Sequence, residues 1–122
     1  MANPQKRKGD AGEREAAQLL TELLASDAIT VRRKLGAGRT TSAGGDVGDL
    51  DGVPSHAIQV ASWANVAAAA RLKPIAAAEQ ADNAGVPFAA TLVRFRGGIW
   101  RVVLTPEQWA AYLRLLLREG LL

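Results

Sequence analysis

The chain has 122 residues, no cysteine, a formal net charge of +3 and a pI near 9.8. This length predicts a single domain spanning residues 1–122, and the missing thiols exclude disulfides and thiolate metal sites. Residues 1–39 hold eight Lys and Arg against five Asp and Glu, so the whole basic excess is N-terminal and favours an anionic partner. Since no run approaches the roughly 18 apolar residues that span a bilayer, the sequence predicts a soluble cytoplasmic protein without a membrane partner.

The first half of the chain predicts one helix, three short strands and a polar loop. Residues 10–25 repeat leucine and alanine at three- and four-residue steps, which is typical of an amphipathic helix, and the basic residues before them are expected to be flexible. Residues 28–35 are rich in β-branched and cationic side chains and predict a strand, whereas the Gly, Thr and Ser content of 36–46 predicts a loop. Residues 47–52 and 56–62 predict two further strands around a tight connection.

The second half predicts a helix, a hairpin and a final helix. Residues 64–84 are alanine-rich, but Pro74 cannot donate a backbone hydrogen bond, so we expect two helical pieces or a start near Pro74. Residues 86–95 and 99–104 predict a hairpin around a Gly-Gly turn, and a Thr-Pro-Glu start predicts a helix over 105–118. The order αβββαββα predicts a mixed central β-sheet flanked by helices, an α/β fold.

Acidic side chains gather before the connection between the second and third strands. Because side chains alternate across a strand, Asp49 and Gln59 could share one face, with Ala61 pointing the same way. Magnesium prefers oxygen ligands, commonly one or two carboxylates with waters and phosphates, and Asp49, the Gln59 amide and the Val60 carbonyl could supply them. The competing interpretation is that the three aspartates within 46–51 are turn residues, since Asp hydrogen-bonds its own backbone.

Four segments, in this order, carry a family resemblance. They are KRKGDAGEREAAQLL (6–20), VRRKLGAGRTTSAGGD (31–46), GDLDGVPSHAIQV (48–60) and GGIWRVVLTPEQWAAYL (97–113). Together they resemble the Holliday junction resolvases of the PD-(D/E)xK nuclease superfamily, particularly the short phage-encoded branch. The resemblance implies a restriction-endonuclease-like fold and a homodimer that cuts two opposing strands of a four-way DNA junction. It also implies hydrolysis of phosphodiester bonds with Mg²⁺, for which Mn²⁺ is expected to substitute, in the host cytoplasm if the protein is phage-encoded.

The resemblance assigns catalytic positions residue by residue. Glu13 corresponds to the family's helix-one glutamate and Asp49 to its metal-binding aspartate, while the E-x-K motif falls on Gln59, Val60 and Ala61. The implied metal ligands are Asp49, Gln59 and the Val60 carbonyl, because an amide oxygen can still bind magnesium without adding charge. Alanine, however, cannot orient the attacking water or stabilise the charge that develops on the phosphate, which is the implied role of the lysine.

Three explanations for Gln59 and Ala61 stay open on the sequence. The lysine, alone or together with the glutamate, could have been exchanged to disarm a nuclease. The protein could bind branched DNA without cutting it. A cation from the following helix, such as Lys73 or Arg71, could reach back into the site. A nuclease acting on linear duplex DNA would share the same chemistry and differ in dimer geometry.

The predicted DNA contacts are cationic and hydroxyl side chains of the N-terminal third, which suit phosphate oxygens. They are Lys6, Arg7, Lys8, Arg14, Arg32, Arg33, Lys34, Arg39, Thr40, Thr41 and Ser42. The apolar end YLRLLLREGLL (112–122) exceeds what one helix face needs, so it predicts a partner surface that a homodimer would bury.

Other polar and aromatic residues are assigned weaker roles. His56, the single histidine, is expected to be structural or exposed. Glu79 and Gln80, in the helix after the motif strand, are either polar neighbours of the site or part of a solvated face. The tryptophans are expected to anchor a core or an interface, with one exception that could stack on a base because it follows the motif. The anchors are Trp100 and Trp109, and the exception is Trp63.

Overall fold

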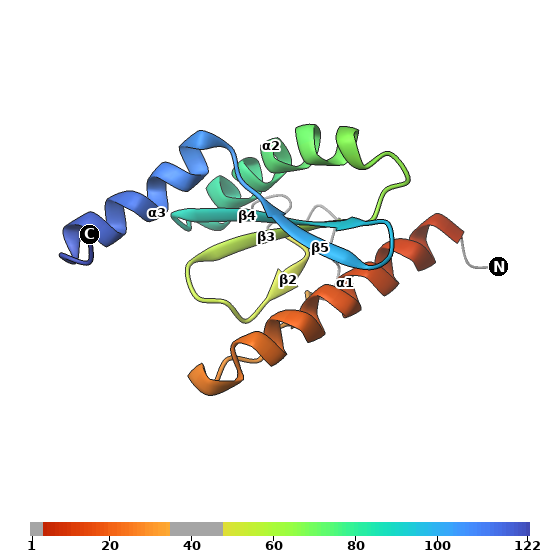
Figure 1. Cartoon of the computed structure of the whole chain (residues 1–122), viewed down its shortest axis with the longest axis horizontal. Coiled ribbons are helices and arrows are strands. Elements are labelled where there is room, and N and C mark those ends of the chain that lie inside the picture. Colours follow the sequence, from red (N-terminus) through yellow and green to blue (C-terminus); the bar gives the residue numbers. More distant parts are fainter. Residues whose placement is uncertain (1–3, 35–47) are drawn as a thin grey trace.

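A mixed five-stranded sheet with a helix on each face forms the centre of the computed structural model, which describes residues 4–34 and 48–122 (Figure 1). The strands lie in the order β1-β2-β3-β4-β5, and all neighbours are antiparallel except the parallel pair β3 and β4. The elements are α1 (Pro4–Leu23), η1 (Ala25–Asp27), β1 (Arg32–Arg33), β2 (Leu50–Asp51), β3 (His56–Ala61), α2 (Val66–Ala84), β4 (Phe88–Phe95), β5 (Ile99–Val103) and α3 (Pro106–Arg118). The predicted α/β class and the order αβββαββα are confirmed.

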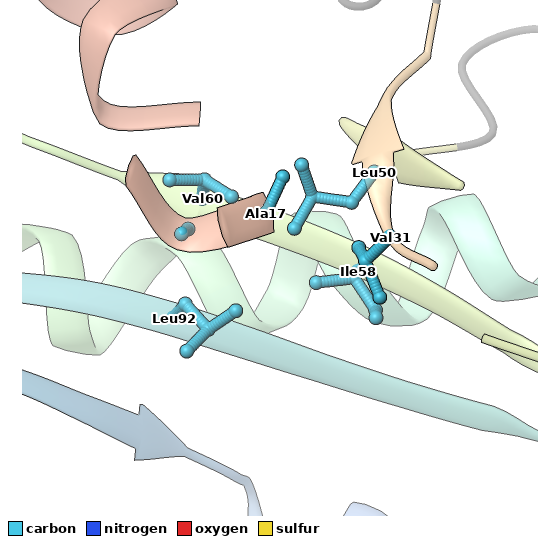
Figure 2. Packing of buried hydrophobic residues seen from close by; sticks show 7 residues of the cluster. Ala17, Val31, Leu50, Ile58, Val60 and Leu92 are labelled. Atoms are coloured by element: carbon cyan, nitrogen blue, oxygen red, sulfur yellow. The ribbon is translucent and has the colours of Figure 1, made fainter. Parts of the chain in front are cut away.

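The two faces of β3 pack against different helices. Ile58 and Val60 face α1, where they join the main apolar cluster (Figure 2). That cluster consists of Ala16, Ala17, Val31, Leu50, Ile58, Val60 and Leu92. Ala57 and Ala61 face α2 on the other side of the sheet. Because most buried side chains there are alanines, α2 can lie close to the sheet, and any larger residue on that face needs its own accommodation.

Helix α1 begins at Pro4 rather than at the predicted Asp10. Proline is favoured in the first turn of a helix, and the residues that follow it are mostly good helix formers. The basic segment at the start of the chain therefore continues into the helix that covers the sheet.

The first two strands are shorter than predicted, at two residues each. Ala28 has a left-handed backbone conformation, with φ of 57°, which interrupts the predicted strand 28–35. The Thr21 hydroxyl then bonds both backbone groups of Val31, accepting from the N–H at 2.8 Å and donating to the carbonyl at 3.0 Å. A side chain of α1 thus occupies the backbone groups that a longer strand would use, and β1 starts only at Arg32.

Helix α2 runs unbroken through Pro74, so the predicted interruption is wrong. Asn65 caps its start by accepting from the Ala68 N–H at 3.0 Å, and Gly85 ends it in a left-handed conformation. Pro74 is buried, and its carbonyl accepts a hydrogen bond from Gln108 Nε2 at 2.8 Å. The alanine-rich flanks have high helix propensity and the bond from α3 holds the segment around Pro74 in place, so the helix continues despite the missing N–H donor.

The C-terminal third follows the sequence closely. Gly97 and Gly98 both have positive φ and form the predicted hairpin turn between β4 and β5. Thr105 caps α3 in a capping box with Gln108. In the described part of the chain, no helix is long and apolar enough to cross a membrane.

The aromatic side chains divide between the core and the surface. Trp100 packs against the main apolar cluster, as predicted for an anchor. Trp63 and Trp109 are exposed, at 41% and 58%, and neither belongs to a core cluster, so Trp109 does not anchor the core. His56 stacks on Phe88, which in turn stacks on Tyr112 of α3, and burial raises the pKa of that tyrosine. His56 has the structural role expected of it, joining β3, β4 and α3.

Candidate functional site

Asp49 is a buried carboxylate at the end of the ladder between β2 and β3, only 5% exposed. Its Oδ2 accepts a hydrogen bond from the Val60 N–H at 2.9 Å, and its own N–H donates to the Ile58 carbonyl at 2.8 Å. The Asp49 carbonyl accepts from the Lys34 N–H at 2.9 Å. The Asp49 side chain therefore accepts the hydrogen bond that a backbone carbonyl of a longer β2 would accept. Backbone groups of β3 fix its position.

The position before Asp49 has a backbone conformation and surroundings that favour glycine, which is Gly48. It has φ of +110°, and a Cβ placed on it would lie 3.2 Å from both the N and the O of Ile58. A side chain at this position would strain the backbone and crowd β3. The Gly-Asp pair is thus required locally for the chain to approach β3 closely enough for the Asp49 carboxylate to reach Val60.

Gln59 lies on the α2 face of β3 and is 5% exposed. Its Oε1 accepts a hydrogen bond from Gln80 Nε2 of α2, so the polar neighbour suggested by the sequence does meet the motif strand, whereas Glu79 is exposed. Thr91 of β4 pairs with Gln59 in the parallel register and is fully buried. The amide oxygen that could bind a metal is therefore engaged by a side chain between the sheet and α2.

Ala61 is 1% exposed and packs against Ala69 of α2 and Val93 of β4. A lysine at this position would project into a contact made of small residues. Lys73, one of the cations proposed to replace it, has its Nζ 5.2 Å from the centre of the Trp63 ring. Arg71, the other proposed cation, is exposed.

Glu13 takes part in an ion-pair cluster between α1 and β1. Arg33 donates from Nε to Glu13 Oε1 at 3.0 Å and from Nη2 to Asp10 Oδ1 at 2.8 Å. All three side chains are partly exposed, Glu13 least at 16%. The predicted helix-one glutamate, Glu13, is thus paired with Arg33, which is one of the predicted DNA contacts.

Three of the predicted catalytic residues have different partners in this arrangement. Glu13 accepts from Arg33, whereas Gln59 and Asp49, two of the predicted metal ligands, accept from Gln80 and from the Val60 N–H. Among residues 4–34 and 48–122, no three His, Cys, Asp or Glu side chains form a group that could hold a metal ion. Asp49 has the carboxyl chemistry of a magnesium ligand, but it is engaged by hydrogen bonds, as Gln59 is.

Some of the predicted DNA contacts are exposed, some are engaged with other residues, and the rest lie outside what the structure describes. Arg14 and Arg32 are exposed, and Arg33 is held in the ion pairs with α1. Lys34 donates its backbone N–H to Asp49 and is partly buried. The side chains of Lys6, Arg7 and Lys8, and the whole of Arg39, Thr40, Thr41 and Ser42, lie outside what the structure describes.

A second ion-pair cluster joins α1 to the hairpin of β4 and β5. Glu15 Oε1 accepts from Trp100 Nε1 at 2.8 Å and from Arg94 Nε at 3.2 Å. The hydrogen bond from Trp100 is the main cause of a lowered pKa for Glu15; Arg94 adds to it and partial desolvation opposes it. Glu13 and Glu15 of α1 thus contact different strands. Glu13 pairs with Arg33 of β1, and Glu15 bonds to side chains of β4 and β5.

A groove lies beyond the carboxyl ends of the parallel strands β3 and β4, next to the start of α2. Its lining includes Ser62, Trp63, Asn65, Arg94, Phe95 and Arg96. Arg94 and Arg96 were not among the predicted contacts, because only the parallel pairing places the end of β4 beside the end of β3. The helical crossover between two predicted strands is the sequence signal that could have indicated this neighbourhood.

Comparison of this chain with protein-family models, with curated proteins and with solved structures finds no match. Any assignment of function therefore depends on the residues, their geometry and the resemblance in the sequence.

Proposed function

We propose that this chain acts on branched DNA as a resolvase-type nuclease domain, through a site centred on Asp49 that hydrolyses phosphodiester bonds in the presence of magnesium. The observation that carries the proposal is the buried Asp49 carboxylate, held by the Val60 N–H inside the motif strand. The resemblance assigns the metal-binding aspartate to this position. The confirmed element order and the N-terminal basic excess are compatible with the same function.

Asp49 is the residue that would hold the metal. When bound, magnesium would polarise the scissile phosphate and lower the pKa of a bound water. The hydrogen bond from Val60 fixes the orientation of the carboxyl group, and a fixed oxygen donor suits a hard cation. The exposed cations Arg14 of α1 and Arg32 of β1 would bind phosphates that flank the cleaved bond.

The second candidate function is binding of branched DNA without cleavage. It is favoured by the engagement of Gln59 with Gln80 and by the packing of Ala61 against Ala69. In this case the fold and the basic residues serve recognition, and Asp49 serves mainly to end the ladder between β2 and β3.

A junction assay separates the two functions. Binding of a labelled four-way junction, in competition with linear duplex of the same sequence, is measured together with cleavage in Mg²⁺ and in Mn²⁺. The proposal predicts junction preference and cleavage that Asp49→Asn abolishes while binding is retained. Junction binding with no cleavage in either metal would support the second candidate, and equal affinity for duplex would contradict the choice of substrate.

A further inference from the structure

The groove beyond β3 and β4 combines an exposed indole with cationic and apolar side chains, and none of the proposed catalytic residues lines it. It encloses about 780 Å³, within the range of small-molecule pockets and large enough for a nucleotide. Trp63 lies two residues beyond Ala61, so the groove is the direct continuation of the motif strand.

We infer that this groove holds one unpaired nucleotide of a DNA strand, with its base stacked on Trp63 and its phosphate beside Arg96. The inference rests on the proposed action on DNA and deepens it, because it names where a base would go when its pair opens at a branch point. It also predicts that an unpaired base of the substrate is recognised, which the candidate catalytic residues do not require.

Trp63 has the properties of a stacking platform. It exposes 41% of its surface although the Lys73 ammonium lies 5.2 Å from its ring centre. A cation over the ring favours one orientation of the indole and so reduces the entropy lost when a base stacks on it. Lys73 also brings a positive charge next to the position of a stacked nucleotide.

The charges around the groove suit a single phosphate. Arg94 is partly compensated because it donates to Glu15, the one carboxylate bonded to the lining cations in the described chain. Arg96 is exposed at the rim, on the β4 side of the β4–β5 turn. Together with the partly compensated Arg94 it gives the groove a positive balance.

The mixture of side chains favours an unpaired base over duplex backbone. Contacts to duplex phosphates need cations and hydrogen-bond donors, whereas an indole and the partly buried Phe95 offer apolar surface that a phosphate cannot use. Single-stranded DNA sites pair such aromatic platforms with basic residues. The occupant that uses both parts of the groove is therefore a base with its attached phosphate.

The test measures affinity for a labelled oligodeoxythymidylate of about eight nucleotides and for a duplex of the same length. Trp63→Ala is expected to weaken single-strand binding about 5- to 100-fold and duplex binding less than about twofold. Trp63→Phe, which keeps an aromatic ring, should recover most of the loss. Trp109→Ala is the matched control, because Trp109 is equally an exposed tryptophan but lies outside the groove. Arg96→Gln should lower the slope of log affinity against log salt by about 0.7.

The outcomes separate this inference from the proposed function. If Trp63→Ala and Trp109→Ala bind the oligonucleotide equally well, the groove inference is overturned, while preference for a four-way junction would still stand or fall on its own assay. If Trp63 controls single-strand binding but junctions are not preferred, the groove stands and the junction assignment fails. No binding of either DNA by the folded chain would overturn both.

Discussion

Asp49 has a structural task as well as a candidate chemical one. Its carboxylate satisfies the buried Val60 N–H, and leaving such a donor unpaired costs about 1–3 kcal/mol. An alanine variant would therefore lose stability and any metal ligand together, and lost activity would not distinguish them. Asparagine keeps one oxygen for Val60 while it removes the charge and replaces the other oxygen by an NH2 group, which is why Asp49→Asn is more informative than alanine.

Glu15 should make stability depend on acid pH. The Trp100 N–H, and after it Arg94, lower its pKa below the ordinary value of 4.5. Because the folded pKa is lower than the unfolded one, the stabilisation is fully present above about pH 4.5 and is lost as the pH falls through the folded value. We expect Glu15→Gln to reduce the free energy of unfolding at pH 7 by less than about 1 kcal/mol, since the pair is exposed, and to have less effect at pH 3.

Urea unfolding at pH 7 and pH 3 measures this difference. Glu79→Gln, an exposed glutamate of α2, is the matched control and should show a smaller change between the two pH values. An effect of Glu15→Gln that grows as the pH falls would contradict the assigned direction of the pKa.

At the scale of elements, the approach of α1 to the end of β3 depends on Gly12. A Cβ on Gly12 would lie 2.9 Å from the Ser62 Cβ, so one element would have to move, whereas a Cβ on Gly9 meets nothing within 4 Å. Gly9→Ala should stabilise the chain by about 0.5–1 kcal/mol through helix propensity. Gly12→Ala should gain the same helix propensity, but crowding against Ser62 should outweigh it, so that the chain is destabilised by about 1–2 kcal/mol.

Chemical denaturation of both glycine variants gives the comparison directly, since each adds the same methyl group to the same helix. Equal stabilisation by the two substitutions would show that α1 does not press against Ser62, and the packing of α1 on the sheet would then need revision.

Local signals predicted those elements whose ends are fixed by their own residues. The Thr105 cap and the Gly97-Gly98 turn are examples, because capping and positive φ are local properties. The sequence did not predict the shortness of β1, which depends on Thr21, or the continuity of α2 through Pro74, which is supported by Gln108. Both depend on contacts between segments distant in the chain, and no periodicity encodes them.

The candidate site was predictable to a similar extent. The Gly48-Asp49 pair follows from turn chemistry and places the carboxylate beside the motif strand. The hydrogen bond between Gln59 and Gln80 depends on how α2 crosses the sheet, and the neighbouring groove depends on the parallel pairing of β3 with β4. The sequence thus indicated which residues could be ligands. The side chains that these residues contact follow only from the arrangement of the strands and helices.

At the scale of the whole molecule, the C-terminal end carries the apolar surface expected of a partner contact. Helix α3 projects from one end of the sheet (Figure 1), and Leu117, Leu121 and Leu122 are each 60% exposed or more. We expect a homodimer that buries this surface, because clustered exposed leucines are rare on monomers. Sedimentation over a range of concentrations should show association that Leu117→Glu weakens at least about tenfold.

Ile99→Glu provides the control for that substitution, since Ile99 is 48% exposed at the start of β5, the end of that strand remote from α3. A chain that stays monomeric at every concentration, or that dissociates equally with either substitution, would contradict the proposed dimer surface.

The proposed function requires that Asp49 and the motif strand form a nuclease site for branched DNA. The most direct measurement is magnesium-dependent cleavage of a four-way junction by Gln59→Glu/Ala61→Lys, with junction binding measured in parallel to show that the fold is retained. Introducing the two motif residues should produce or increase cleavage at unchanged binding, and adding Asp49→Asn should remove it. If the double variant binds the junction as the original chain does but never cuts, the site is not a nuclease site and the protein is a binding module.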